Sequence, residues 1–550
     1  METLFDRRRE LLVRAVQAAH ERSFWSAFSE VPRTYGEEMP AAAKDAFAEL
    51  LDRPFDLDQP ASEGWVGSEI SPFGRALGIA YPRTGIDLLI ENAEVAGQGW
   101  KAASVEQRTG IALEILVRLN SLSFVMAHAV EQTTGQAFAM AFQAGGPHAQ
   151  DRGLEAVAYA FEEMARIPGS VTWEKPAGRQ AIRLDKEFHV VPRGIGLVIG
   201  CATFPTWNSY PALFADLVAG NPVIVKPHPA VVLPLALTVK VGREVLAEQG
   251  FDPDVLQIAV DSVDAPVAPS LALHPAVALV DFTGSSEFGS WLRENVRGKP
   301  IFTEETGVNT IVIESADSFE AMCQNIAFSL SLYSGQMCTS PQCIFIPEGG
   351  ISTDDGHKSF AEVAAGIATA IDTLLSEPQR AAVVCGAIQN EATKDRIARA
   401  RRLGRIVRDS APLAGFEGGR TATPLILAVD ATDEAAYLEE RFGPISFVIA
   451  CRDAADAISR AADAAKAKGG ITAALYSTDD TLIDAAALKY VDAGVPLSVN
   501  LTGGIYVNQS AAFSDYHVTG ANPAGNACLT DAAFVTSRFR VVCVRRPAVA

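Results

Sequence analysis

Short, continuous apolar segments alternate with longer amphipathic stretches over most of the chain. Residues 196–285 contain the apolar segments GLVIGCATF, NPVIVKP, VLQIAV and VALVDFTGS, separated by stretches long enough for helices. A strand that is apolar on both faces is typical of a parallel sheet covered by helices on both sides. A second series of such segments, from QCIFIP to ITAALYS, follows Cys338. The pattern therefore predicts an α/β protein with two doubly wound domains.

Two other patterns lie outside these domains. Helical spacing of apolar residues over residues 1–85 predicts an N-terminal helical extension, which we expect to pack on the fold. Alternating segments at about 179–192 and 530–550 predict a hairpin and a C-terminal strand with no partner close in sequence. Because an exposed edge strand usually needs pairing, we expect these segments to form an oligomerisation element of a homodimer or homotetramer.

Composition narrows the class of protein. The net charge of −20 argues against nonspecific binding to nucleic acid or to anionic membranes. The eight cysteines are scattered, with no CxxC pair, so we expect no structural metal site and a reducing, cytoplasmic location. No apolar run reaches the roughly 18 residues of a membrane span, and the charged N-terminus does not resemble a signal peptide. These features favour a cytoplasmic enzyme.

One cysteine has unusual neighbours. The segment SGQMCTSPQ, residues 334–342, places Cys338 between small polar residues. Most unpaired cysteines are buried and inert, and a reactive thiol needs special surroundings, so this segment alone assigns no function. Cys343 lies in an apolar strand and is interpreted as core, and Met337 as a packing residue.

Four further segments give Cys338 a context. They are FPTWNSYP, VIVKPHP, FTGSSEFG and EETGVN, the last followed by GQMC. In this order and spacing they resemble the aldehyde dehydrogenase superfamily over roughly residues 90–550. The resemblance implies an aldehyde dehydrogenase-like fold, with a Rossmann-like cofactor-binding domain over 86–305, interrupted by the hairpin, and a catalytic domain over 306–515.

The resemblance also implies the catalytic residues. Cys338 is the nucleophile that forms a thiohemiacetal and then a thioester, and Asn208 with the Cys338 backbone N–H stabilises the oxyanion. Glu304 activates water, and we prefer it to Glu305 because the downstream glycine and asparagine then match the family pattern. Thr306 replaces a family glycine, which predicts restricted movement of Glu304. We expect Gly335 to leave room for the reactants.

A nicotinamide cofactor is the second implication. The stretch FTGSSEFG resembles the pyrophosphate contact at a helix start, and the family lysine matched by Lys226 bonds the adenosine ribose. Three residues beyond it stands Pro229, preceded by His228, where NAD-preferring relatives often carry glutamate, so we expect NADP to be preferred over NAD. The segment LEERFGPISF resembles the family contact with the nicotinamide ribose and ring. The implied cofactor-binding residues are Trp207, Lys226, His228, Gly284, Ser285, Gly289, Glu440 and Phe442.

The substrate is implied by residues 510–542 and the N-terminal extension, which resemble the phenylacetic acid degradation PaaN subgroup. That resemblance implies oxidation of a coenzyme A-linked semialdehyde formed by ring cleavage in phenylacetate degradation. Three alternatives stay open: a coenzyme A-acylating aldehyde dehydrogenase, which Glu304 argues against, a noncatalytic binding protein with the same fold, and a cysteine esterase without a nicotinamide cofactor.

Overall fold

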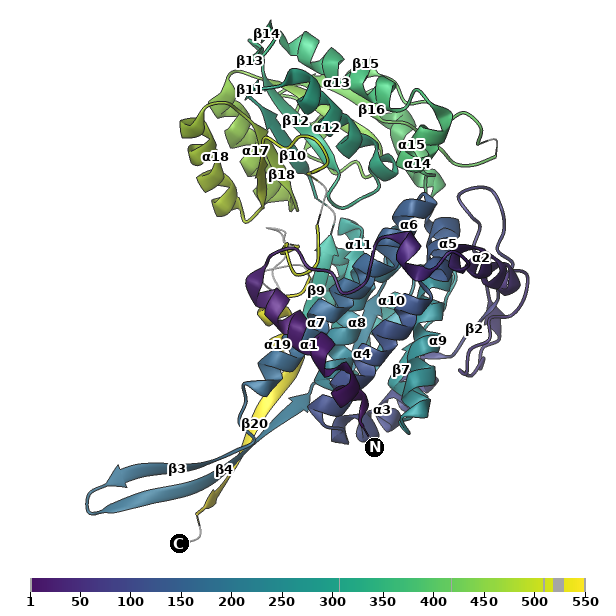
Figure 1. Cartoon of the computed structure of the whole chain (residues 1–550), viewed down its shortest axis with the longest axis vertical. Helices are drawn as coiled ribbons and strands as arrows, with labels where there is room; N and C mark the ends of the chain where they lie inside the picture. Colours follow the sequence, from purple (N-terminus) through teal and green to yellow (C-terminus); the bar gives the residue numbers. More distant parts are fainter. Residues whose placement is uncertain (1, 306, 417, 508–509, 518–528, 549–550) are drawn as a thin grey trace.

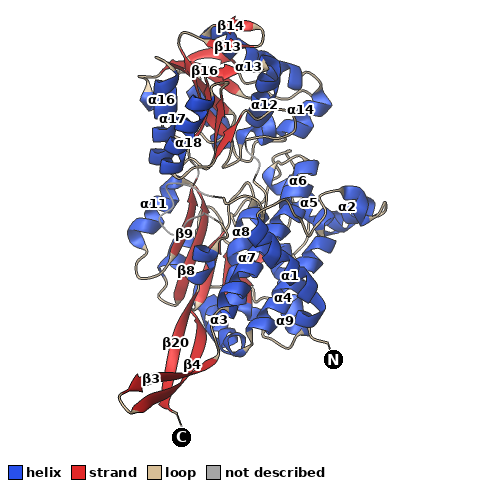
Figure 2. Ribbon diagram, turned by 60° about the vertical axis from the view of Figure 1, so that its left-hand side comes forward, coloured by secondary structure: helices blue, strands red, loops and turns tan. Residues whose placement is uncertain are grey.

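The computed structural model describes residues 2–305, 307–416, 418–507, 510–517 and 529–548. Two α/β lobes are stacked along the long axis of the molecule, and a long arm of strands extends from the lower lobe (Figure 1). Each lobe contains a sheet with helices packed against it, as Figure 2 shows from another side. The alternation of apolar strands and helices in the sequence predicts this arrangement.

The lower lobe contains a five-stranded parallel sheet in the order β7-β6-β5-β8-β9. Because all five strands are parallel, their carboxyl ends lie at one edge, which faces the upper lobe (Figure 1). The elements are β5 (Ile195–Ile199), α8 (Pro205–Ala219), β6 (Val223–Lys226), α9 (Leu233–Glu248), β7 (Leu256–Ile258), α10 (Ala268–Leu273), β8 (Val277–Gly284), α11 (Ser286–Asn295) and β9 (Ile301–Glu305).

The upper lobe contains a seven-stranded sheet in the order β15-β16-β17-β12-β10-β18-β19, parallel except for β15. A small sheet of β11 (Ser315–Ala316), β13 (Ile351–Thr353) and β14 (Gly356–Lys358) lies at its far end (Figure 1). The main strands are β10 (Asn309–Ile313), β12 (Pro341–Pro347), β15 (Arg405–Arg408), β16 (Leu425–Asp430), β17 (Ile445–Cys451), β18 (Ala473–Tyr476) and β19 (Leu497–Val499). The helices are α12 (Phe319–Ser331), α13 (Phe360–Leu374), α14 (Pro378–Cys385), α15 (Glu391–Ala400), α16 (Glu434–Tyr437), α17 (Ala454–Lys468) and α18 (Asp480–Ala493).

The N-terminal residues pack on the helices of the lower lobe. Helix α1 (Leu4–Glu21) begins at a capping box of Thr3 and Asp6 and packs against α4 and α7. It is followed by α2 (Met39–Leu50) and the short strands β1 (Trp65–Val66) and β2 (Tyr81–Pro82), and then by α3 (Ile86–Ala102), α4 (Val105–Ser121), α5 (Ser123–Thr134), α6 (Phe138–Gly145) and α7 (Pro147–Ala165). Within the described residues no single helix has the length and apolarity to cross a membrane, and one pair, α4 and α5 bent by 74°, passes that test together.

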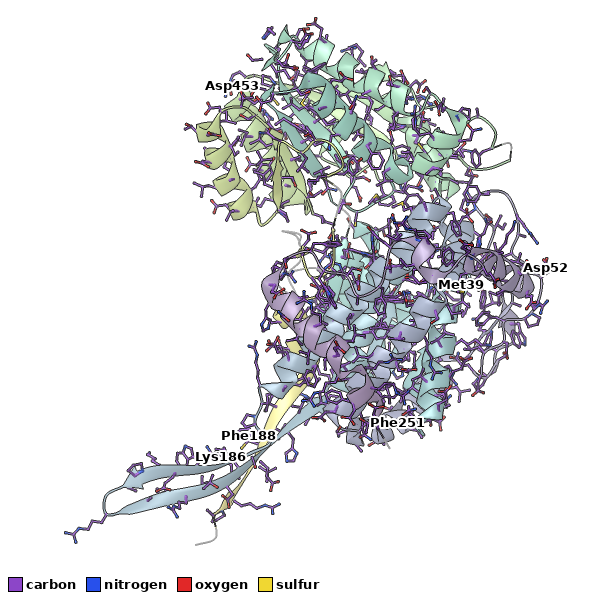
Figure 3. All side chains as sticks on the ribbon, in the orientation of Figure 1. Met39, Asp52, Lys186, Phe188, Phe251 and Asp453 are labelled. Carbon is purple, nitrogen blue, oxygen red and sulfur yellow. The ribbon has the colours of Figure 1, made fainter. Side chains whose placement is uncertain are left out.

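The arm consists of β3 (Ser170–Ala177), β4 (Gln180–Pro192) and the C-terminal strand β20 (Phe539–Pro547). The prediction of a hairpin within 179–192 is wrong in its bounds, because that segment is a single long strand and the turn lies at Gly178, where φ is +65°. Strand β20 pairs antiparallel with β4 over its whole length. Figure 3 shows the side chains of the arm, Lys186 and Phe188 among them, standing clear of both lobes.

Buried charges anchor the base of the arm. Arg538, which directly precedes β20, is fully buried and forms ion pairs with Asp216 of α8 at 2.9 Å and with Asp281 of β8 at 2.6 Å. These contacts connect the C-terminal strand to the core of the lower lobe. Removing one partner of such a buried group leaves an uncompensated charge.

Candidate active site

The carboxyl edge of the five-stranded sheet collects the residues that the sequence motifs single out. Lys226 ends β6, Gly284 ends β8, and Glu304 is the last residue but one of β9. Asn208 lies in the first turn of α8, which follows β5. Ligands of open α/β sheets bind at this edge, because the strand ends and helix N-termini meet there. The fold therefore brings the predicted residues of the lower lobe to one place.

An irregular turn presents Cys338 to this edge. A short 3₁₀ segment, η3 (Leu332–Gly335), holds Tyr333, Ser334 and Gly335 at φ values of 49°, 49° and 63°. A side chain on Gly335 would lie 2.6 Å from the carbonyl oxygen of Gly443. Gly335 therefore permits a left-handed turn and a close backbone approach, whereas the sequence predicted that it leaves room for the reactants.

Asn309 holds the loop that carries Cys338. Its amide nitrogen donates to the carbonyl oxygens of Cys338 at 2.7 Å and of Ser340 at 3.0 Å. Its amide oxygen accepts from the backbone N–H groups of Ile471 at 2.8 Å and Thr472 at 3.1 Å. Since all four bonds come from one buried amide at the start of β10, the Cys338 loop is fixed to the central strands of the upper lobe.

Four side chains meet at the junction of the two lobes. Asn208 Nδ2 donates to Glu304 Oε2 at 2.8 Å, and His517 Nε2 lies 2.8 Å from Glu304 Oε1. The Cys338 sulfur lies 3.8 Å from His517 Nε2. Asn208, Glu304 and His517 are buried, whereas Cys338 is partly exposed. The cluster combines a thiol, a carboxylate and an amide donor, the three groups that the predicted chemistry requires.

The environment of Glu304 keeps its carboxyl group ionised. Burial acts to raise its pKa, but the charge of His517 and hydrogen bonds from His517, Cys338 and Asn208 outweigh burial and lower the pKa. The neighbouring Glu305 turns away and forms an ion pair with Arg293 of α11. The structure thus places Glu304, rather than Glu305, beside Cys338. Thr306, which was expected to restrict Glu304, lies outside the described residues.

The same cluster offers metal-binding atoms. The sulfur of Cys338, the ring nitrogen of His517 and the carboxylate of Glu304 lie within 4.8 Å of one another. The 2.8 Å between His517 Nε2 and Glu304 Oε1 is a direct hydrogen-bond distance. Two ligands on one tetrahedral zinc ion stand about 3.3 Å apart, so this geometry is that of a hydrogen-bonded group.

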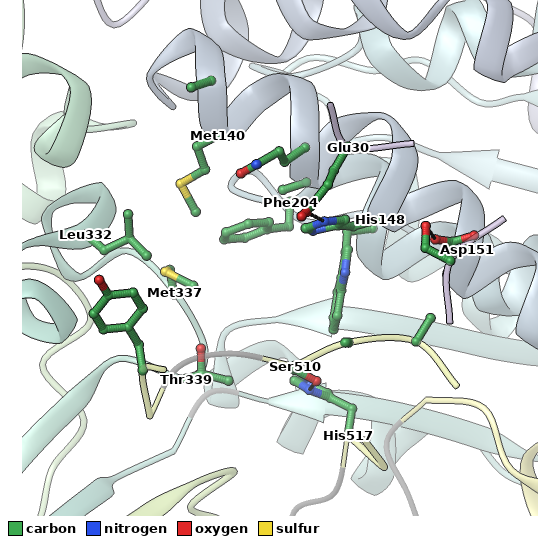
Figure 4. A pocket seen from close by; sticks show the side chains of 18 of the residues that line it. Glu30, Met140, His148, Asp151, Phe204, Leu332, Met337, Thr339, Ser510 and His517 are labelled. Carbon is green, nitrogen blue, oxygen red and sulfur yellow. Dashed lines mark hydrogen bonds and ion pairs between the residues drawn. The ribbon is translucent and has the colours of Figure 1, made fainter. Parts of the chain in front are cut away.

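A cavity of about 580 Å³ leads to Cys338 and His517 (Figure 4). Its wall is largely aromatic and aliphatic, with contributions from the helices of the lower lobe, the Cys338 loop and residues 24–30 of the N-terminal part. Among the described residues that line it there is no lysine or arginine. Representative apolar lining residues are Phe24, Trp25, Met140, Phe204, Trp207 and Tyr506.

The sequence predicts that the N-terminal extension only packs on the fold, but residues 24–30 also line the cavity. Glu30 and His148 face one another across the cavity wall at 2.6 Å (Figure 4). Asp151 accepts hydrogen bonds from Ser26 Oγ at 2.6 Å and from the Ala27 N–H at 3.0 Å. The N-terminal extension therefore forms part of the wall next to the reactive thiol.

The predicted ribose contact has a carboxylate that the sequence did not reveal. Lys226 Nζ forms an ion pair with Asp261 at 2.6 Å, and both groups are buried. Burial, followed by the charge of Lys226, lowers the pKa of His228 to about 4. The imidazole is therefore neutral at pH 7. Among Lys226, His228 and Asp261, Lys226 carries the only positive charge, and this charge is paired with Asp261.

The other predicted cofactor residues lie on both lobes. Ser285 caps α11 by accepting from the Phe288 N–H, so the N-terminus of this ten-residue helix follows directly on Gly284. Such a helix start favours a pyrophosphate group. Gly289 packs against Glu305, which a side chain at this position would meet at 2.4 Å.

Glu440 and Phe442 lie in the loop before β17. Gln342 holds this loop by donating to the carbonyl oxygens of Tyr437 at 2.8 Å and Glu439 at 3.0 Å.

Comparison with known proteins decides between the possible interpretations of this geometry. A model described as the aldehyde dehydrogenase family matches residues 80–524. The chain belongs to the aldehyde dehydrogenase family. It is accordingly an oxidoreductase that acts on aldehydes, and its fold is the aldehyde dehydrogenase fold predicted from the motifs.

Three relatives of this aldehyde dehydrogenase differ in sequence identity and in structural similarity to it. A crystal structure of an NAD-dependent aldehyde dehydrogenase from Burkholderia multivorans is 51% identical, with a TM-score of 0.97 over 100% of this chain and 99% of that one. N-succinylglutamate 5-semialdehyde dehydrogenase of Burkholderia multivorans is 27% identical over 401 residues, 72% of this chain and 77% of the relative. A 1-pyrroline-5-carboxylate dehydrogenase from Thermus with bound NAD, 18% identical, has a TM-score of 0.74 over 96% and 99% of the two chains and shows the shared fold.

Several side chains of this dehydrogenase have contacts that the sequence did not predict. Trp207, predicted to bind the cofactor, lines the cavity and packs edge-on against His517 at 5.0 Å. Met337 also lines the cavity, whereas Cys343 is fully buried as predicted. Cys201 was missed, and its thiol donates to the amide oxygen of Asn208 at 3.6 Å.

His517 was missed as well. The segment SDYHVTG carries no motif that marks this histidine, and its place depends on contacts far away in the sequence. Arg22 lies 3.7 Å above the ring of Tyr516, and Trp25 packs edge-on against Phe513 at 4.8 Å. The N-terminal extension thus holds the loop that brings His517 to Glu304.

Proposed function

We propose that this protein oxidises an aldehyde to a carboxylic acid through a thiohemiacetal and a thioester on Cys338. The observation that supports this most is the cluster in which Glu304 hydrogen-bonds Asn208 within reach of the Cys338 sulfur. An acid-forming dehydrogenase needs a nucleophile, a donor for the oxyanion and a base for water, and the cluster contains all three.

Each residue has one step in this proposal. The Cys338 thiolate attacks the carbonyl carbon of the aldehyde, and the second N–H of Asn208 Nδ2 donates to the resulting oxyanion. A nicotinamide cofactor, when bound, accepts the hydride that leaves this carbon. Glu304, held ionised by its neighbours, then removes a proton from the water that hydrolyses the thioester. The acid is released and Cys338 regains its proton.

We propose NAD as the cofactor, in place of the NADP preference expected from Pro229. Lys226 and Asp261 at the end of β6, with the start of α11, suit the ribose hydroxyls and the pyrophosphate. The Asp261 carboxylate would repel a 2′-phosphate, and neutral His228 offers no compensating charge. The NAD-dependent name of the 51% identical structure supports the same choice.

For the aldehyde we propose an uncharged, largely apolar carbon chain. The lining of the cavity has no lysine or arginine among the described residues to pair with a carboxylate, and Glu30, whose pKa is lowered by its hydrogen bond with His148, would repel one. The coenzyme A-linked semialdehyde from ring cleavage in phenylacetate degradation fits if its acyl chain fills the cavity and its charged end stays outside. The dicarboxylate semialdehyde in the names of the curated relatives fits this wall less well.

The test is formation of NADH from a panel of aldehydes. We expect turnover of apolar and thioester-linked semialdehydes, little turnover of carboxylate-terminated ones, and none in Cys338→Ala. Glu304→Gln should form the thioester but release acid slowly. If coenzyme A releases the product from Glu304→Gln as fast as from wild type, the enzyme is coenzyme A-acylating. Absence of NADH formation with every aldehyde would favour a noncatalytic binding protein.

We also propose that the arm joins two copies of this chain. Its strands expose apolar side chains, Val171, Ile182, Val541, Val542 and Val544, that are each 39–51% accessible. The outer edge of β3 has no strand partner within the described chain, and a second copy would cover both features. Light scattering should give an even-numbered oligomer, and Val542→Lys should lower its mass. The free thiols of the described cysteines suit a cytoplasmic location.

A further inference from the structure

We propose that His517 is a further catalytic residue, which takes the proton of the Cys338 thiol and so generates the attacking thiolate. This proposal rests on the proposed role of Cys338 as the nucleophile. His517 Nε2 lies 3.8 Å from the Cys338 sulfur and 2.8 Å from Glu304 Oε1. Sulfur hydrogen bonds are long, so the first distance brings the imidazole to the reacting atom itself.

The orientation of the ring is fixed from both sides. His517 Nδ1 faces Ser510 Oγ at 3.4 Å, and Ser510 in turn accepts from Arg152 Nη2 at 2.9 Å. One face of the ring packs against Trp207 in an edge-on contact at 75°. Figure 4 shows His517 beside Ser510 at the end of the cavity where Thr339 follows Cys338. These contacts direct Nε2 toward Glu304 and Cys338.

The proton balance of the step is simple. The S–H bond of Cys338 breaks and an N–H bond forms directly at Nε2 of neutral His517, whose own ring proton is on Nδ1 and faces Ser510 Oγ. The new N–H then donates to Glu304 Oε1. The products are a thiolate and an imidazolium, and the net charge of the cluster does not change. The lowered pKa of Glu304 keeps the proton on the ring rather than on the carboxylate.

The charged groups around the ring agree with this assignment. Two groups face Nε2, the Glu304 carboxylate of β9 at 2.8 Å and the Cys338 sulfur at 3.8 Å. Arg152 of α7 lies on the far side, beyond Ser510 and Trp207, and its charge is paired with Glu155 at 2.8 Å.

Alkylation of the thiol by iodoacetamide tests the proposal without any aldehyde or cofactor. The rate at Cys338 is followed by mass spectrometry from pH 5.5 to 10, with free N-acetylcysteine alkylated under the same conditions as the reference thiol. In His517→Asn we expect the rate at pH 7 to fall at least about tenfold and the midpoint to rise by about one pH unit or more. His20→Asn is the matched control, because His20 also contacts a glutamate, Glu162, at 2.8 Å but lies outside the site.

A second variant keeps the proposal falsifiable if His517→Asn does not fold. Glu304→Gln retains the imidazole, so we expect its alkylation rate at pH 7 to stay within about threefold of wild type. If Glu304 alone were the base for the thiol, Glu304→Gln would lose reactivity and His517→Asn would not. Either of those two results overturns the proposal. Activity of Cys338→Ala would instead refute the nucleophile, so the two failures are distinguishable.

Discussion

Asp151 gives the sharpest test of how the N-terminal extension is held in the cavity wall. Its carboxyl group is buried and bonds Ser26 and the backbone of Ala27. Burial, only partly offset by these hydrogen bonds, raises its pKa from 3.8 to about 7. A carboxyl group whose pKa is raised in the folded state stabilises the fold at low pH, and this stabilisation is lost as the pH rises toward the folded value.

The size of the effect follows from this shift. Each pH unit between the unfolded and the folded pKa costs about 1.4 kcal/mol, and the loss levels off near the folded pKa, so wild type loses about 2 kcal/mol between pH 5 and pH 7 from this group alone. Asp151→Asn removes the titration. Its amide oxygen can still accept from Ala27, and its nitrogen can donate to Ser26 Oγ, whose single proton then goes to the Phe28 carbonyl oxygen at 2.8 Å.

The assay is urea unfolding of both proteins at pH 5, 6, 7 and 8, followed by tryptophan fluorescence. We expect Asp151→Asn to gain about 2 kcal/mol relative to wild type between pH 5 and pH 7 and little beyond. Asp45→Asn, on the exposed face of α2, is the control and should show a constant difference. An equal difference between Asp151→Asn and wild type at all four pH values would refute the reasoning.

Three other predictions concern the buried ion pairs of Arg538, the choice of cofactor and the loop that carries Cys338. Arg538→Met leaves two buried carboxylates without their cationic partner and should lower stability by about 3–5 kcal/mol in denaturant unfolding, whereas unchanged stability would mean that these ion pairs add nothing. Asp261→Asn should raise kcat/KM with NADP relative to NAD by about tenfold or more, and an unchanged ratio would contradict the proposed repulsion. Asn309→Ala releases the Cys338 carbonyl and should lower kcat about tenfold or more in steady-state kinetics, which a merely local packing role would not do.

The fold was largely predictable because its strands are apolar on both faces. Four such strands, β5 to β8, form the parallel sheet of the lower lobe together with β9, whose sequence IFTEE is half polar. The motifs at the carboxyl ends meet there because parallel strands share one edge. The turn of the arm was misplaced because β4 alternates over thirteen residues, and nothing in that pattern separates one long strand from two short ones.

The site was predictable only where a motif spans consecutive residues. Asn208, Glu304 and Cys338 lie in such motifs, and the structure brings them together. His517 and Asp261 reach the site through tertiary contacts, with an N-terminal segment and with the end of a neighbouring strand respectively. The spacing of residues along the chain does not reveal such tertiary contacts, so these two residues could not be identified from the sequence.

The most direct test of the account is to trap the covalent intermediate on Cys338. Glu304→Gln is mixed with NAD and an apolar aldehyde, NADH is recorded during the first turnover, and the protein is digested for mass spectrometry. The account predicts a burst of about one NADH per chain and an acyl adduct on the peptide that contains Cys338. A burst without an adduct, or an adduct on another residue, would contradict it.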